Sequence, residues 1–207
     1  MIRGEINMYK ADPKALHPKN FYSFFSGSLT PRPIAWVTTK NDDGGLNLAP
    51  YSFFSGVNTR PPMIMVSIGN HQGRKKHTAE NILREKEYFV DIANETQLNQ
   101  MNQSAKKYEK NVSEVTELSL NTISSEYIKT PRLEGVLAAF ECVLYEYHEL
   151  PGNHVFYLEV KCIHIDEKYI KDGQIDTETY KPLARFLGNS YAVDYRIIRT
   201  NHPDHEV

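Results

Sequence analysis

Residues 136–165 read VLAAFECVLYEYHEL-PGN-HVFYLEVKCIHI, two apolar runs joined by a Pro-Gly-Asn turn. Proline and glycine are typical turn residues, and the aromatic and β-branched residues of both runs favour strands. The stretch therefore predicts a long antiparallel hairpin with one buried face. In such a hairpin, positions summing to about 304 lie opposite each other. Cys142 and Cys162 are then expected to face one another across the strands, as two small core residues.

The chain before this hairpin predicts more strands and two short helices. β-branched and apolar runs are separated by a tight turn at NDDGG and by a longer loop, NLAPYSFFSGV. Short strands, glycine and proline turns and a long hairpin favour an antiparallel barrel over a doubly wound parallel sheet. The expected strands are 34–39, 63–68 and 88–93, and the expected helices are 78–87 and 96–108.

Composition favours one domain with a small-molecule partner. The 207 residues are 40% hydrophobic, which is enough for one sizeable core. The formal net charge is -2 with both signs interspersed, so no strong field attracts nucleic acid or an anionic membrane. No run approaches the roughly 20 apolar residues of a spanning helix, and MIRGEINMYK lacks the apolar segment of a secretory signal. We therefore expect a cytoplasmic protein.

Several common catalytic motifs are absent from the sequence. It contains no GxSxG, HExxH, P-loop or GxGxxG pattern, so hydrolase, zinc peptidase, NTPase and Rossmann readings lack their usual support. The eight histidines are scattered, and the two cysteines are not spaced for zinc. We predict no metal site.

The hexapeptide YSFFSG occurs twice, at 22–27 and at 51–56. Both copies precede a proline-containing turn and an apolar run, so we expect the same loop-to-strand geometry twice. There is no third copy, which excludes a repeat architecture. Local convergence and an ancient duplication both remain open as the origin of the likeness.

The second copy follows Asn47-Leu48-Ala49-Pro50, and this context suggests a binding loop. Pro50 restricts the residue before it to extended conformations. The Ser52 hydroxyl and nearby backbone groups could then hydrogen-bond the edge of a flat heteroaromatic ligand, with Phe53 or Phe54 against its apolar side. The alternative is an ordinary connection with core aromatics.

A second candidate site is the basic stretch GRKKHT, residues 73–78, directly before the first predicted helix. Cations beside the free N–H groups of a helix start make a phosphate site, to which Thr78 would contribute a hydroxyl. The alternative is a solvated basic loop in which Thr78 only caps the helix. Together, the two candidate sites suggest a ligand with a flat ring and a phosphate tail, as in a mononucleotide cofactor.

Five blocks of this sequence resemble the flavin reductase-like family, which has the FMN-binding split-barrel fold. In chain order, from about Phe21 to about Tyr191, they are PRPIAWVTT, GGLNLAPYSFFSG, RPPMIMVSI, KKHTAENI and ARFLGNSY. The resemblance implies a mostly β, antiparallel Greek-key split barrel with a few helices outside it. It also implies a single domain over residues 1–207 with its core at about 21–191, and a homodimer with FMN near the subunit interface.

The resemblance also assigns roles to individual residues. A first group would line the isoalloxazine ring and a second would hold the phosphate, while Arg185 would approach the flavin or the partner subunit. His77 departs from the aspartate that many members have there. The implied ring residues are Asn47, Ala49, Pro50, Tyr51, Ser52 and Phe53, and the implied phosphate residues are Arg74, Lys76 and Thr78.

The function implied by the resemblance is NAD(P)H-dependent reduction of FMN, with hydride transfer to flavin N5. Flavin carries this chemistry itself, so no residue is assigned as a general base. One alternative is an FMN-containing electron carrier, flavoredoxin-like, that exchanges electrons with a redox partner protein. Another is a barrel that binds no flavin and acts through protein contacts. No feature of the sequence separates the reductase from the electron carrier.

Overall fold

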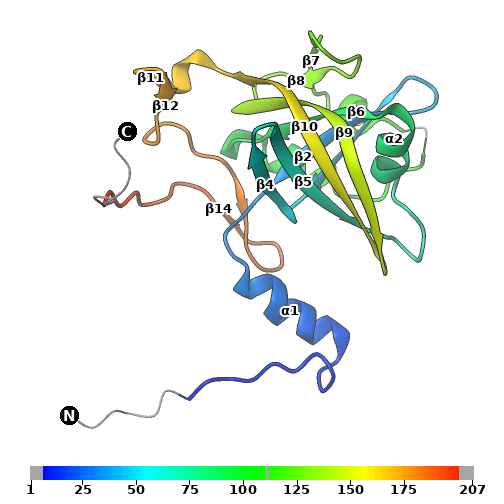
Figure 1. Cartoon of the computed structure of the whole chain (residues 1–207), viewed down its shortest axis with the longest axis vertical. Helices are drawn as coiled ribbons and strands as arrows, with labels where there is room; N and C mark the ends of the chain where they lie inside the picture. The colour runs from blue at the N-terminus through cyan, green and yellow to red at the C-terminus, as the bar shows by residue number, and fades with distance from the viewer. Residues whose placement is uncertain (1–6, 111, 201–207) are drawn as a thin grey trace.

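At the centre of the molecule is an antiparallel sheet that curls into a barrel (Figure 1). The computed structural model describes residues 7–110 and 112–200. Strand accounts for 38% of the chain and helix for 19%, which confirms the predicted mostly β class with a few helices. The sheet has seven strands in the order β3-β2-β6-β9-β10-β5-β4. Their bounds are β2 (Ala35–Lys40), β3 (Leu46–Tyr51), β4 (Phe54–Thr59), β5 (Pro62–Gly69), β6 (Glu87–Ile92), β9 (Ala138–Leu150) and β10 (Asn153–Ile165).

The two edge strands of this sheet, β3 and β4, follow each other directly in the chain. Only Ser52 and Phe53 separate them, so the chain passes from one edge of the sheet to the other at a single corner. The backbone N–H of Ser67 in β5 donates to the carbonyl of Phe53 at 2.8 Å. The prediction of a loop at NLAPYSFFSGV is therefore wrong. Its first half is β3, which pairs with β2, and its second half is β4, which pairs with β5.

The predicted long hairpin is confirmed, with 13 residues in each of β9 and β10. The predicted facing of the two cysteines is wrong. The register between the strands shifts twice, and these irregularities place Cys142 opposite Val160 and Cys162 opposite Glu141. A bulge adds a residue to one strand, so a constant-sum register does not hold along the whole hairpin.

Both faces of the sheet are buried, as β2 shows. Successive residues of a strand point to opposite faces. Val37 belongs to the cluster inside the barrel with Phe156, whereas Trp36 belongs to a second cluster with Met101. Helix α2 (His77–Glu85) contributes Ala79 and Ile82 to the first cluster. The second cluster is covered by α3 (Leu98–Gln103) and α4 (Glu114–Glu117).

Both predicted helices exist with shorter bounds. The helix expected at 78–87 is α2, which ends at Glu85 because Lys86 adopts a left-handed conformation, with φ 63°, and donates its N–H to the carbonyl of Ile82. The helix expected at 96–108 is the 3-10 turn η1 (Glu95–Gln97) followed by α3. It stops at Gln103, and the next side chain, Ser104, is buried.

The remaining elements lie outside the barrel sheet, and all of them except α1 are only two or three residues long. One three-stranded sheet, in the order β1-β13-β14, joins the region before the barrel to the region after it. The bounds are α1 (Pro18–Ser28), β1 (Arg32–Pro33), β7 (Thr122–Ile123), β8 (Arg132–Leu133), η2 (Glu167–Tyr169), β11 (Ile170–Lys171), β12 (Gln174–Ile175), β13 (Ala184–Arg185) and β14 (Tyr191–Ala192).

The two YSFFSG copies adopt different structures, so the expectation of one geometry twice is wrong. The first copy is helical within α1, whereas the second spans the corner between β3 and β4. Pro18 occupies the first turn of α1, and the His17 side chain accepts the N–H of Lys19 at 3.3 Å. These features start a helix. The second copy instead pairs with neighbouring strands on both sides of its corner.

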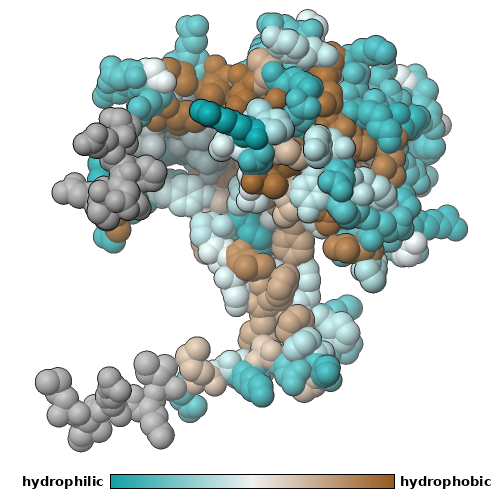
Figure 2. Space-filling view, in the orientation of Figure 1, coloured by the Kyte–Doolittle hydropathy of each residue, from teal (hydrophilic) through white to brown (hydrophobic). Residues whose placement is uncertain are grey.

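Helix α1 projects from the barrel, which it contacts through its C-terminal end (Figure 1). It presents several large apolar side chains to solvent, and Figure 2 shows apolar side chains along the segment that leads to it. Within residues 7–110 and 112–200, no helix has the length and apolar run needed to span a bilayer. The exposed apolar side chains of α1 and its C-cap, with their exposed fractions, are Tyr22 (59%), Phe24 (43%), Phe25 (47%) and Leu29 (48%).

The cysteine register predicts two thiols that react separately. Cys142 is fully buried, and burial raises the pKa of its thiol well above the ordinary value; partial burial raises the pKa of Cys162, which is still partly exposed. We expect a chromogenic disulfide reagent to modify Cys162 slowly in native buffer and Cys142 only in guanidinium chloride. Cys162→Ser should then leave no reactive thiol in native buffer. A disulfide between the two cysteines in the purified protein would contradict this register.

Candidate functional site

A pocket of about 400 Å³ lies where β3 meets the start of α2. Its lining comes from three stretches of chain: the end of β3, residues 71–78, and residues 104–110 with Glu114. The pocket thus combines the β3 part of the predicted ring-binding segment with the predicted phosphate-binding segment. The predicted residues that line it are Asn47, Ala49, Pro50, Tyr51, Arg74, Lys76 and Thr78.

A second pocket of about 270 Å³ adjoins the first. Both pockets are lined by Pro50, Tyr51 and Ala105. Ser52 and Arg185 line only the second pocket, and Phe53 lines neither of them. The two pockets therefore form a groove that continues past Pro50-Tyr51.

Thr78 is the hydrogen-bonding centre of the first pocket. Its hydroxyl oxygen accepts from the Asn47 amide at 2.8 Å and from the Tyr51 hydroxyl at 2.9 Å. All three side chains are buried, and burial raises the pKa of Tyr51 well above its ordinary value. Thr78 is not the residue that caps α2, because the cap position is Lys76. The Thr78 hydroxyl keeps its own proton free to donate to a ligand oxygen.

The start of α2 brings positive charge to the same place. The first N–H groups of a helix have no partner within the helix. The Lys76 ammonium lies 5.4 Å from the centre of the Tyr51 ring, and its desolvation against the pocket wall lowers its pKa. Lys75 is paired with Glu149 at 3.6 Å, whereas Arg74 and Lys76 have no ion-pair partner among residues 7–110 and 112–200. The site is therefore suited to an anion.

Arg32 is a pocket residue that our sequence analysis missed. It is 8% exposed and lines the second pocket. Its guanidinium donates to the Ser52 hydroxyl at 3.3 Å, to the carbonyl of Ser26 and to the carbonyl of Phe186 at 3.1 Å. Arg32 thereby links both YSFFSG copies to the β13-β14 turn. The only signal in the sequence was an arginine between two prolines.

Phe53 lies behind this link. Its ring meets the Phe25 ring edge-on with centroids 6.3 Å apart, and the Arg32 guanidinium lies 5.9 Å from its centroid. Phe53 therefore packs one hexapeptide against the other. Arg185 also lines the second pocket. Its guanidinium donates to the Tyr191 hydroxyl and to the Gly188 carbonyl, and it lies over the Tyr191 ring.

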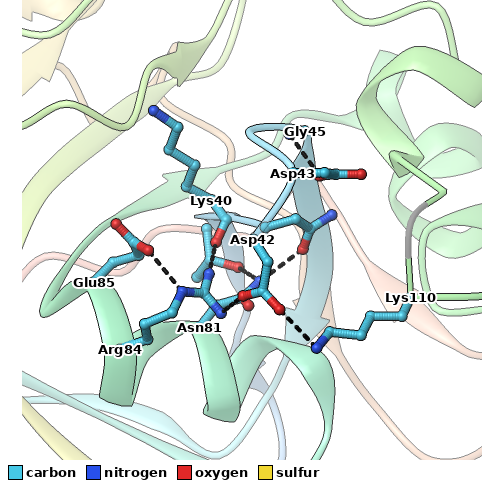
Figure 3. A network of polar contacts seen from close by, with 10 residues as sticks. Lys40, Asp42, Asp43, Gly45, Asn81, Arg84, Glu85 and Lys110 are labelled. Atoms are coloured by element: carbon cyan, nitrogen blue, oxygen red, sulfur yellow. Dashed lines mark hydrogen bonds and ion pairs between the residues drawn. The ribbon is translucent and has the colours of Figure 1, made fainter.

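The segment 104–110 is the other stretch that our sequence analysis missed. The Trp36 indole donates to the Ser104 hydroxyl at 2.9 Å, which fixes the beginning of the segment. Its end is held by Lys110, which pairs with Asp42 at 2.8 Å, and Asp42 also pairs with Arg84 of α2 (Figure 3). The signal available was the charged run AKKYEK after a polar helix.

Asn81 braces the pocket from outside. Its amide donates to the Thr39 hydroxyl at 3.1 Å and to the Asn41 side chain at 2.8 Å, so it ties α2 to the β2-β3 turn (Figure 3).

Among the described residues, no group of three or more His, Cys, Asp or Glu side chains is arranged to hold a metal ion. The first pocket instead offers cations and hydrogen-bond donors, the groups that suit an anion.

The chain is similar to several known proteins. Residues 27–183 match the family described as flavin reductase like domain. YwrF of Bacillus subtilis, an uncharacterized protein, is 33% identical over 193 residues, which are 89% of this chain and 94% of that protein. An uncharacterized protein of Aquifex aeolicus is 33% identical over 82% of this chain and 88% of its own length.

Solved structures agree with this result. The crystal structure of nitrilotriacetate monooxygenase component B from Bacillus cereus superimposes with a TM-score of 0.90 at 32% identity, over 94% of this chain and 99% of that chain. Flavoredoxin of Desulfovibrio vulgaris shares the fold, with a TM-score of 0.73 at 18% identity over 84% of this chain and 93% of that chain. A family match over most of the chain, supported by relatives at one-third identity, shows that this protein belongs to the flavin reductase-like family of split-barrel flavoproteins.

Proposed function

We propose that the protein is an FMN-dependent oxidoreductase that takes electrons from NAD(P)H. The observation that carries this proposal is the groove formed by two pockets that share Pro50 and Tyr51, with a basic helix start at one end and apolar and polar side chains at the other. Membership of the family supports flavin binding and oxidoreductase chemistry. The nicotinamide donor is our inference.

The first pocket would hold the FMN phosphate. Arg74 and Lys76 supply positive charge, the first N–H groups of α2 supply donors, and Thr78 supplies a hydroxyl proton. Charge-assisted hydrogen bonds to phosphate are about twice as strong as neutral ones. The donors present thus match the chemistry of a phosphate monoester.

The wall shared by the two pockets and the second pocket would hold the isoalloxazine ring. Ala49, Pro50 and Tyr51 offer apolar surface, and Ser52 offers a hydroxyl. Arg32 and Arg185 add positive potential to the second pocket, which favours the electron-rich reduced ring. Bound FMN would supply the redox chemistry, accepting a hydride from NAD(P)H and passing two electrons to an acceptor. The protein's residues bind and orient; none is needed as a general base.

An anaerobic titration tests this function directly. We expect the purified protein to bind added FMN and the flavin absorption band to bleach on addition of NADH or NADPH, because the groove would bring donor and flavin together. The nucleotide that bleaches faster is the preferred donor. Flavin that stays bound but unbleached with both nucleotides would overturn the donor assignment in favour of an electron carrier. Failure to bind FMN would overturn the proposal as a whole.

Lys76→Gln tests the phosphate end of the groove. The Lys76 side chain makes no capping hydrogen bond, so its replacement should leave α2 intact. We expect FMN to bind roughly ten- to a hundredfold more weakly, because hydrogen bonds to charged groups contribute about 1.5–3 kcal/mol. Calorimetric titration measures the change, and Lys168→Gln, at an exposed ion pair elsewhere, is the control. Equal affinity of wild type and Lys76→Gln would place the phosphate elsewhere.

We also propose that two copies form a homodimer through α1. The helix projects from the barrel and exposes large apolar side chains, a pattern typical of protein interfaces. Sedimentation velocity should show a dimer for the wild type and a shift to monomer for Phe24→Asp/Leu29→Asp. Tyr145→Asp, at an exposed side chain on β9, adds charge away from α1 and should stay dimeric. A monomeric wild type would contradict the proposal.

A further inference from the structure

The basic stretch before α2 is fastened to the end of the β9-β10 hairpin. The backbone N–H of Asn70 donates to the carbonyl of Gly152 at 2.8 Å, and the Lys75 ammonium lies 3.6 Å from the Glu149 carboxylate. Residues 71–78 supply much of the lining of the first pocket. The hairpin end therefore helps to set where the cations of this pocket lie.

His154 of β10 lies at the centre of this attachment. Its side chain is 1% exposed and points to the same face of the sheet as Phe156, which belongs to the cluster inside the barrel. Nε2 lies 2.7 Å from the Asn70 side-chain oxygen, and Nδ1 lies 2.7 Å from the Tyr147 hydroxyl. The Tyr147 hydroxyl also lies 3.0 Å from the Glu149 carboxylate. We call these four hydrogen-bonded side chains the His154 network.

The His154 network has fewer protons than hydrogen-bonding contacts while the imidazole is neutral. The Asn70 oxygen and the ionised Glu149 carboxylate only accept, and a neutral imidazole and a tyrosine each supply a single proton. These protons cannot fill all the contacts from Asn70 to Glu149. An imidazolium supplies the missing proton: Nδ1–H then donates to the Tyr147 oxygen, and the Tyr147 hydroxyl donates to Glu149.

Two charged side chains face His154, one from each element packed against it. Glu149 on β9 favours the imidazolium, whereas Lys75 in the basic stretch opposes it. Burial is the largest influence, and it lowers the pKa of His154 below the ordinary value. His154 is therefore mainly neutral at neutral pH, and it takes up its proton as the pH falls into the acidic range.

We propose that His154 is a positioning residue for the anion site: by binding a proton it completes the network from Asn70 to Glu149 and strengthens anion binding by the basic stretch. The proton adds a positive charge next to that stretch. It also directs the Tyr147 hydroxyl to Glu149, which weakens the attraction of this carboxylate for Lys75. The inference rests on the proposed anion-binding function of the first pocket and adds its regulation by pH.

The test compares the pH profile of anion binding in the wild type and in His154→Gln. Glutamine keeps an amide donor for Asn70 but cannot take up a proton. His148→Gln is the matched control, because it removes an exposed histidine of β9 that pairs with Glu146. FMN and sodium sulfate are titrated calorimetrically between pH 5 and 8.

These two probes separate the titration of the protein from that of the ligand. Sulfate keeps its charge throughout this pH range, whereas the FMN phosphate itself titrates at about pH 6. His71 and His77 of the pocket lining are present in the wild type and in both variants. The difference between the wild-type and His154→Gln profiles therefore isolates His154.

We expect the wild-type affinity for both probes to rise about three- to tenfold more, from pH 8 to pH 5, than that of His154→Gln, because one nearby charge is only partly screened. His148→Gln should follow the wild type. Tyr147→Phe keeps the ring that stacks on Phe156 but removes the oxygen that accepts from the imidazolium. The NMR titration midpoint of the His154 ring should then move to lower pH, and the rise in affinity should move with it.

Parallel profiles of the wild type and His154→Gln, at equal or uniformly weaker affinity, would overturn the inference and leave His154 only a buried residue that holds the hairpin. If His154→Gln does not fold, Tyr147→Phe decides, and an unmoved midpoint has the same consequence. Sulfate binding with the expected profile but without FMN binding would support the inference and contradict the flavin function. FMN binding with parallel profiles would do the reverse.

Discussion

The corner between β3 and β4 is the constraint on which the rest of the structure depends. The chain moves from one edge of a seven-stranded sheet to the other across Ser52 and Phe53 alone, so the two edges must come together. The corner brings the end of β3 next to β5, where the carbonyl of Phe53 accepts the N–H of Ser67, while most of β4 stays exposed. The same closure puts Pro50-Tyr51, the last residues of β3, between the two pockets. Barrel closure and the groove thus have one physical origin.

Arg32 stabilises that corner at some electrostatic cost. Its buried guanidinium donates to carbonyl groups and a hydroxyl, and no carboxylate among the described residues pairs with it. A buried charge with neutral partners is expensive unless its hydrogen bonds are satisfied. Here the donors reach Ser26 in one YSFFSG copy and Ser52 in the other. The residual positive potential faces the second pocket, where an electron-rich ring would benefit from it.

The sequence predicted the elements whose signals are local. It did not predict the features that depend on long-range contacts. The hairpin of β9 and β10, helix α2 and the basic stretch before it each have a signal within a few residues. The hexapeptide shows the limit: identical residues are helical after His17-Pro18 and extended after Pro50, because flanking caps and strand partners outweigh propensity. Likewise, no local pattern reveals the bulges that move Cys142 and Cys162 out of register.

The candidate site was likewise predicted only in part. Residues on β3 and before α2 could be placed from the sequence, since they belong to blocks with recognisable chemistry. Segment 104–110 could not, because its place in the pocket depends on distant contacts, chiefly the buried one of Trp36 with Ser104 and, more weakly, the exposed ion pair of Asp42 with Lys110. Those contacts turn an ordinary charged run into part of a pocket lining. Charge that looks like a solvated loop in sequence can therefore line a pocket once the barrel has folded.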